Sequence, residues 1–189
     1  MSSEVSTEAD RRYRVVTAAL QAFSRFGYRR TAMADIAAAA GLSRPSLYLV
    51  FPNKAAVFRA LADMLLKDAM TGAEAAWPED MDPAAGLAAA ILAKDLPIHQ
   101  LFAATPHANE ILAEAETLAG DLHRDSAARF AVLVATRLAA AGDDKAADTA
   151  RLVANAADGL KHARLEEATY VADVNRLAAL VAGSLGRAG

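Results

Sequence analysis

The basic side chains near the start of the chain suit one kind of chemistry, the binding of a polyanion. Residues 1–60 contain nine Lys or Arg and four Asp or Glu, whereas the rest of the chain contains 11 basic and 19 acidic side chains. Clustered positive charge attracts nucleic acid through its phosphates. A chance gathering of solvated charges would give the same count, so the charge alone does not decide between the two interpretations.

Side chains suited to catalysis or metal binding are scarce. The chain lacks cysteine, which excludes disulfides, thiolate catalysis and cysteine-based zinc sites. It has no Gly-rich phosphate loop and no nucleophile elbow, and its four histidines lack the tight spacing of a metal-binding helix. We therefore expect a protein that is not an enzyme and that uses neither a cofactor nor a metal.

The composition predicts an all-α protein. The chain is 54% hydrophobic but only 6% aromatic, because alanine, the residue with the highest helix propensity, supplies most of the difference. Polar residues interrupt each apolar stretch before ~18 residues, so we expect no membrane span. The polar start of the sequence lacks the apolar run of a signal peptide, and we expect a cytoplasmic protein.

Apolar residues at helical spacing predict three helices in the first part of the chain, at about 9–26, 32–39 and 44–50. Gly27 is expected to end the first helix. Thr31 and Ser43 are expected to cap the second and third, and Pro45 suits the first turn of the third.

The body is expected to continue as helices separated by Gly and Pro. A fourth helix runs from Lys54 to about residue 71 after the cap Asn53, and a fifth starts at Pro83 after the cap Asp82. The remaining expected elements are a short helix between Pro97 and Pro106, a long helix at 107–141 with a possible break at Gly120-Asp121, and helices at 142–168 and 170–185.

Residues 31–54 have the pattern of a helix-turn-helix. Gly41 permits the positive backbone angle of the turn. Leu47 is expected to seat the second helix of the pair on the core, which leaves Arg44 and Ser46 free to face a groove.

This segment resembles the DNA-binding head of the TetR family of bacterial regulators. The family pattern is matched over roughly residues 11–65 by Ala22-Phe23, Gly27, Thr31, Asp35-Ile36-Ala37, Ala40-Gly41, Ser43, Leu47-Tyr48, Phe51 and Lys54. The resemblance implies a three-helix head followed by a C-terminal helical bundle. Residues 1–9 lack an apolar period and are expected to form a disordered tail. The further divisions are a helix-turn-helix DNA-binding domain at 10–53, a connecting helix at 54–71, and a ligand-binding and dimerisation domain at 72–189.

The resemblance also implies which residues contact a double-stranded, palindromic operator. Arg44 and Ser46 lead into the major groove, and Arg44 can read a guanine edge. The expected phosphate contacts are Thr31, Ser43, Tyr48 and Lys54, with Arg29 and Arg30 as further candidates. Pro45 and the apolar pair Leu49-Val50 depart from a polar reading face, so specificity is expected to rest on Arg44 and on DNA shape.

Two apolar stripes near the C-terminus are candidates for a homodimer interface, as the resemblance implies, although they could also face only their own core. They consist of Leu152, Ala156, Leu160 and Ala163 in one, and of Val171, Val174, Leu177, Leu180 and Val181 in the other.

The middle of the chain is expected to line a pocket for a small hydrophobic or amphipathic ligand, or else to fill the core. The candidate lining residues are Trp77, Met81, His99, Phe102, His107, His123 and Phe130. The expected function is that of a repressor released from its operator by such a ligand. The alternative is an architectural or protein-partner-controlled DNA-binding regulator without a ligand.

Overall fold

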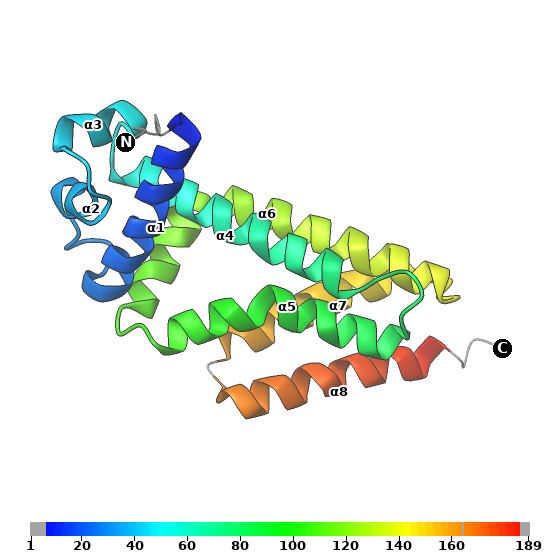
Figure 1. Cartoon of the computed structure of the whole chain (residues 1–189). Helices are drawn as coiled ribbons and strands as arrows, with labels where there is room; N and C mark the ends of the chain where they lie inside the picture. The colour runs from blue at the N-terminus through cyan, green and yellow to red at the C-terminus, as the bar shows by residue number, and fades with distance from the viewer. Residues whose placement is uncertain (1–6, 164, 186–189) are drawn as a thin grey trace, which may run out of the picture. The chain divides into compact units, whose positions relative to one another are not determined.

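The computed structural model describes residues 7–163 and 165–185. These residues form eight α-helices and no β-strand (Figure 1). The helices are α1 (Glu8–Phe26), α2 (Met33–Ala39), α3 (Arg44–Val50), α4 (Lys54–Ala76), α5 (Pro83–Ala103), α6 (Ala108–Ala140), α7 (Ala146–His162) and α8 (Glu167–Leu185). The expected all-α class is therefore confirmed. None of the described helices combines the length and the apolar character that crossing a bilayer requires.

The chain divides into two compact units. Unit 1 comprises residues up to Leu65 together with Thr105–Leu122, and unit 2 comprises Leu66–Ala104 together with the residues from His123 onward. Helices α4 and α6 each begin in unit 1 and end in unit 2.

The core of unit 1 is built around one cluster of aromatic rings. The ring of Phe23 in α1 lies 5.5 Å from those of Tyr28 and Phe58, and the last two rings are 5.2 Å apart. Ile36 of α2 and Leu47 of α3 have no exposed surface and belong to the same core. The two short helices of the helix-turn-helix thus pack on α1, α2 through Met33, Ile36 and Ala37 and α3 through Leu47, the last as the spacing predicted.

The helix ends of unit 1 agree with the predicted ones, apart from two differences. Ser43 caps α3 by accepting the Ser46 N–H at 3.2 Å, and Gly41 has φ +65° in the turn, as expected. The N-cap of α2 is Ala32, not Thr31, and Asp35 accepts the Ala32 N–H at 2.8 Å. Of the tail expected at 1–9, residues 1–6 lie outside the described residues, and Thr7 already caps α1.

Helix α6 is broken at Ala119, whose backbone angles are φ −142° and ψ 17°. The break, one residue before the predicted Gly120-Asp121, is braced by Arg59 of α4. This guanidinium donates to the Leu118 carbonyl at 3.0 Å and to Asp121 Oδ1 at 2.7 Å. The hydrogen bond from Arg59 is the main reason why the pKa of Asp121 lies well below its usual range.

Unit 2 is built on the buried helix α5. Leu87 and Ile91 have no exposed surface and pack in a core with residues of α4, α6, α7 and α8. Helix α5 runs unbroken through Pro97, so the prediction of a separate short helix between the two prolines was wrong. The missing proline N–H leaves the Ala93 carbonyl without its helical donor. Leu92 and Leu96, just before Pro97, pack against the core of unit 2, and tertiary packing of this kind supplies most of the stability of a helix in a protein.

The other boundaries of unit 2 differ from the predictions by a few residues. Helix α4 continues to Ala76 and not to about residue 71, and α7 starts at Ala146 and ends at His162. Asp82 caps α5 through the Ala85 N–H at 2.9 Å, as predicted.

Gly86 lies directly against the indole of Trp77. A Cβ atom at this position would lie 2.1 Å from Trp77 Cδ1 and Nε1, and Trp77 is 1% exposed. We expect Gly86→Ala to lower the free energy of unfolding by about 1–3 kcal/mol through overpacking. The matched control is Gly72→Ala, where the nearest atom lies at 3.5 Å and the helix propensity of alanine adds up to about 1 kcal/mol. Urea denaturation followed by the fluorescence of Trp77 measures both, and an equal effect of the two changes would contradict the packing argument.

Candidate nucleic-acid interface

Helix α3 presents one outward face. Leu47 is fully buried, whereas Arg44, Pro45, Tyr48 and Leu49 are exposed. Because α-helical positions i and i+4 lie on the same side, these four residues cover less than half of the helix circumference. The Arg44 guanidinium lies 5.8 Å from the centre of the Tyr48 ring, which holds the two side chains of the expected interface together.

The two serines expected at the interface contact each other. Ser43 Oγ and Ser46 Oγ are 2.7 Å apart, and Ser43 also accepts the Ser46 N–H. Ser43 is exposed and Ser46 is half-buried. A hydroxyl retains a second lone pair when it accepts one hydrogen bond, so the cap does not by itself remove either serine from contact with a phosphate.

The C-terminal end of α3 is fastened by a residue that the sequence analysis missed. Arg12 of α1 donates from Nη1 to the Val50 carbonyl at 3.1 Å, and its guanidinium lies 4.4 Å from the centre of the buried Phe51 ring. A cation at this end also complements the helix dipole. No sequence spacing pairs residue 12 with residue 50, because the contact depends on how α1 and α3 cross.

Thr31 and Lys54, which the resemblance assigns to phosphate contacts, have internal partners in this structure. Thr31 is 1% exposed, and its hydroxyl donates to the Gly27 carbonyl at 2.6 Å. Burial leaves the Thr31 hydroxyl no surface on which to meet a phosphate, which corrects the expectation for this side chain. Its contacts instead close the loop between α1 and α2, called the α1–α2 loop below (residues 27–32).

Lys54 holds the same loop from the start of α4. Its ammonium lies 2.7 Å from the Tyr28 carbonyl, 2.9 Å from the Thr31 carbonyl and 3.3 Å from the Arg29 carbonyl. An ammonium has three N–H donors, and the three carbonyls match that number. The structure therefore gives Lys54 a positioning role, and its contact with phosphate stays a prediction.

The α1–α2 loop is held from its other side by the first turns of α6. Glu110 Oε1 accepts the Arg29 N–H at 2.6 Å, and Arg29 Nε lies 3.5 Å from Glu114 Oε1. Arg30 Nη2 lies 3.2 Å from His107 Nε2. The side chain of Arg29 is 77% exposed in spite of its ion pair. Both arginines therefore lie at the surface of unit 1, and their contact with DNA stays a prediction.

The residues proposed for dimerisation fall into two groups. Leu152 of α7 and Leu180 of α8 are 61% and 62% exposed. Val174 has no exposed surface and belongs to the core of unit 2, so it cannot contact a partner and its assignment to the interface was wrong. The half-buried members pack partly on that core and are Leu160, Val171, Leu177 and Val181. Ala156 is half-buried and Ala163 exposed.

The expected pocket residues do not form one group. Trp77 and Phe130 are buried members of the core of unit 2, and Met81 is 38% exposed. Phe102 and His123 are half-buried in unit 2, whereas His107 belongs to unit 1. His99 is 7% exposed and stacks on Tyr170 with ring centres 4.7 Å apart. Among residues 7–163 and 165–185, no group of three metal-ligating side chains is close enough to hold a metal ion.

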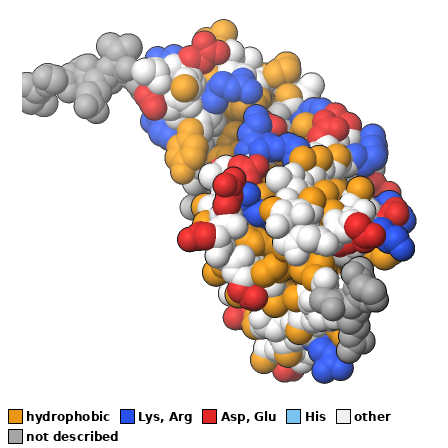
Figure 2. All heavy atoms as spheres, turned by 90° about the vertical axis from the view of Figure 1, so that its right-hand side faces the viewer, with side chains coloured by type: hydrophobic (Ala, Val, Ile, Leu, Met, Phe, Trp, Pro, Cys, Tyr) orange, Lys and Arg blue, Asp and Glu red, His pale blue; other side chains and the backbone are white. Residues whose placement is uncertain are grey.

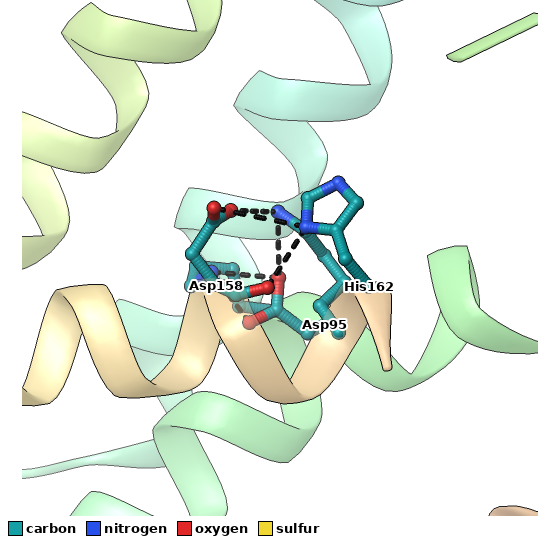
Figure 3. A network of polar contacts seen from close by, with 5 residues as sticks. Asp95, Asp158 and His162 are labelled. Carbon is teal, nitrogen blue, oxygen red and sulfur yellow. Dashed lines mark hydrogen bonds and ion pairs between the residues drawn. The ribbon is translucent and has the colours of Figure 1, made fainter. Parts of the chain in front are cut away.

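A polar network that the sequence analysis missed lies in unit 2, on α5 and α7, with the side chains of Lys94, Asp95 and Lys161 largely buried (Figure 3). Lys94 Nζ lies 2.6 Å from Asp95 Oδ1, and Lys161 Nζ lies 3.9 Å from the same oxygen. Lys161 also pairs with Asp158 at 2.9 Å, and His162 Nδ1 lies 2.8 Å from the Asp158 carbonyl. Burial lowers the pKa of Lys94 in spite of the adjacent Asp95 carboxylate.

Tyr170 of α8 adds a polar atom next to this network. Its hydroxyl is buried and has no hydrogen-bond partner among the described residues. Burial, and secondly the charge of Asp95, raise the pKa of Tyr170. A buried hydroxyl without a partner is unfavourable, and this one lies within the core of unit 2.

We expect Glu110→Ala to loosen the α1–α2 loop, because it removes the acceptor of the Arg29 N–H. Loss of one hydrogen bond to a charged group, about 1.5–3 kcal/mol, should accelerate hydrogen exchange of the Arg29 amide about tenfold to a hundredfold. Glu110→Gln is the matched control, since it keeps an oxygen acceptor at the same place. Amide exchange followed by NMR measures both variants, and an unchanged rate in Glu110→Ala would refute the role of this carboxylate.

Comparison with known proteins shows what the first part of the chain resembles. Residues 15–61 match the model for bacterial regulatory proteins of the tetR family. A 73-residue stretch is 41% identical to the probable HTH-type transcriptional regulator ArpR of Pseudomonas putida. That match covers 38% of this chain and spans about a third, 35%, of the relative.

Solved structures resemble the chain over most of its length. A transcriptional regulator from Rhodococcus sp. Rha1 has a TM-score of 0.72 at 18% identity, covering 92% of this chain and 95% of that chain. The fatty acid degradation regulator FadR from Bacillus halodurans has a TM-score of 0.67 at 16% identity, with the same two coverages. These likenesses extend the shared fold from the helix-turn-helix head to the helical body. The likeness to bacterial regulatory proteins of the tetR family therefore covers residues 15–61, and the solved structures show a common fold beyond them.

Proposed function

We propose that this protein is a sequence-specific DNA-binding transcriptional regulator whose α3 enters the major groove of its operator. The observation that carries the proposal is the outward face of α3, where exposed Arg44 and Tyr48 lie together on a helix seated by buried Leu47. A short helix held in this way fits the major groove, and a guanidinium at its start can donate two hydrogen bonds to guanine.

The test of this function is selection of duplexes from a random DNA library by the purified protein. Enrichment of one palindromic motif, followed by its tight and salt-dependent binding, is the expected result. A protein that retains no duplex above background at low salt would overturn the proposal.

Arg44 is expected to carry base recognition. Arg44→Ala should weaken binding to the selected operator by about 1–3 kcal/mol and relax the preference at one base pair of each half-site. The matched control is Arg25→Ala, which removes a positive charge from the last turn of α1 and should leave the preference unchanged. Fluorescence anisotropy with operator and single-base variants measures both. Equal loss of preference in the two variants would show that Arg44 acts by charge alone.

We infer that the regulator acts as a homodimer formed through α7 and α8. Two heads are needed to cover two half-sites about one helical turn apart. The support in this chain is the exposure of one large leucine on each of these helices, Leu152 and Leu180. Figure 2 shows one face of the molecule on which hydrophobic side chains lie open between charged ones.

Leu152→Asp and Leu180→Asp should each produce a monomer, because a carboxylate would be buried without a partner in the interface. Operator affinity should fall by about tenfold or more as the second head loses its high effective concentration. Val132→Asp is the control, since Val132 is 65% exposed on α6. Sedimentation velocity measures the mass, and leucine variants that remain dimeric would place the interface elsewhere.

We further propose that a small hydrophobic or amphipathic ligand bound in unit 2 releases the regulator from its operator by a population shift. The buried Tyr170 hydroxyl without a partner, beside His99, supports a polar contact for such a ligand. The FadR structure is that of a fatty acid degradation regulator, which makes fatty acids a reasonable first panel. The alternative, an architectural or partner-controlled regulator, is favoured if no member of a metabolite panel both raises the melting temperature and dissociates the operator complex.

A further inference from the structure

The outward face of α3 is apolar on one side. Leu49 is 87% exposed, the largest exposed fraction of any large apolar side chain among the described residues. Pro45 is also exposed and lies four residues before Leu49, about one helical turn, so the two side chains lie on the same side of the helix. The remaining exposed residues of this face, Arg44 and Tyr48, lie on its other side.

Singly exposed leucines are common on protein surfaces, but the setting of Leu49 restricts what can cover it. The leucine shares a seven-residue helix with Arg44 and lies in the basic first third of the chain. The occupant that best complements this face is negatively charged and offers an apolar group within about one to one and a half helical turns of the guanidinium.

Duplex DNA meets both requirements at one kind of base pair. Its phosphates supply the charge, and thymine is the base that presents a methyl group in the major groove. Five residues separate Arg44 from Leu49, a rise of about 7.5 Å along the helix. That rise equals roughly two base-pair steps of ~3.4 Å when the helix follows the groove.

We propose that Leu49, with Pro45 beside it, is a specificity-determining residue that selects thymine in each operator half-site by packing against its 5-methyl group. The inference rests on the proposed function, since it names a base that the regulator reads. It also changes the expected basis of specificity, because sequence is then read by an apolar contact in addition to Arg44.

The experiment uses the full-length protein and the operator found by selection, with each thymine replaced in turn by deoxyuridine, which lacks only the methyl group. For the wild-type protein, one replacement per half-site is expected to weaken binding about fourfold, the factor that corresponds to burial of one methyl group. Leu49→Ala should bind the thymine and deoxyuridine operators equally. Leu49→Met, which keeps a similar apolar volume, should restore the discrimination.

Two further measurements make the outcome decisive. Val132→Ala, an exposed apolar residue of α6, should discriminate thymine from deoxyuridine as the wild-type protein does. Because Leu49 is 87% exposed, Leu49→Ala should unfold at nearly the same urea concentration as the wild-type protein. Wild-type protein that binds the operator tightly yet ignores every deoxyuridine replacement would overturn the inference while leaving the proposed function intact. Loss of self-association in Leu49→Ala without a change in base preference would also overturn it and would assign Leu49 to a contact between copies of the chain.

Discussion

The orientation of α3 depends on the burial of a single leucine. A helix of seven residues has too few internal hydrogen bonds to be stable in water on its own, so tertiary contacts must supply the stability of α3. Leu47 provides the apolar anchor in a core shared with Phe23 and Ile36. Once Leu47 points inward, the helical repeat fixes which residues point outward, and the chemical character of the exposed face follows from the sequence alone.

Much of unit 1 serves to hold this helix and the turn before it. Ser43 fixes the N-terminal end of α3 and Arg12 its C-terminal end, one by a hydroxyl and the other by a guanidinium. Lys54 and Glu110 hold the α1–α2 loop from two sides, with a cation on its carbonyls and a carboxylate on an amide. The polar side chains that the resemblance assigned to DNA contacts thus fall into two groups. Some, such as Arg44 and Tyr48, are exposed on α3, whereas Lys54 holds the α1–α2 loop in place.

The sequence predicts what depends on local periodicity and caps. Helix class, the helix-turn-helix and the caps Ser43 and Asp82 could be read from spacing, because each depends on residues within one or two turns. The contact of Arg12 with Val50 joins residues 38 positions apart, and no local pattern encodes it. The burial of Thr31 likewise depends on how α1 and α2 pack. The prediction of a helix end at Pro97 was wrong. Packing of α5 in the core of unit 2 stabilises the helix by more than the loss of one backbone hydrogen bond destabilises it.

The three carbonyls around Lys54 have a consequence for which cation can occupy that site. They converge on one small, tetrahedral ammonium, which can direct a proton to each of them. An arginine would carry the same charge, but its planar guanidinium directs five donors outward in a fixed fork, a shape suited to two parallel acceptors and not to three that share a centre. The exchange most often regarded as conservative for a lysine therefore does not preserve the geometry that this loop requires.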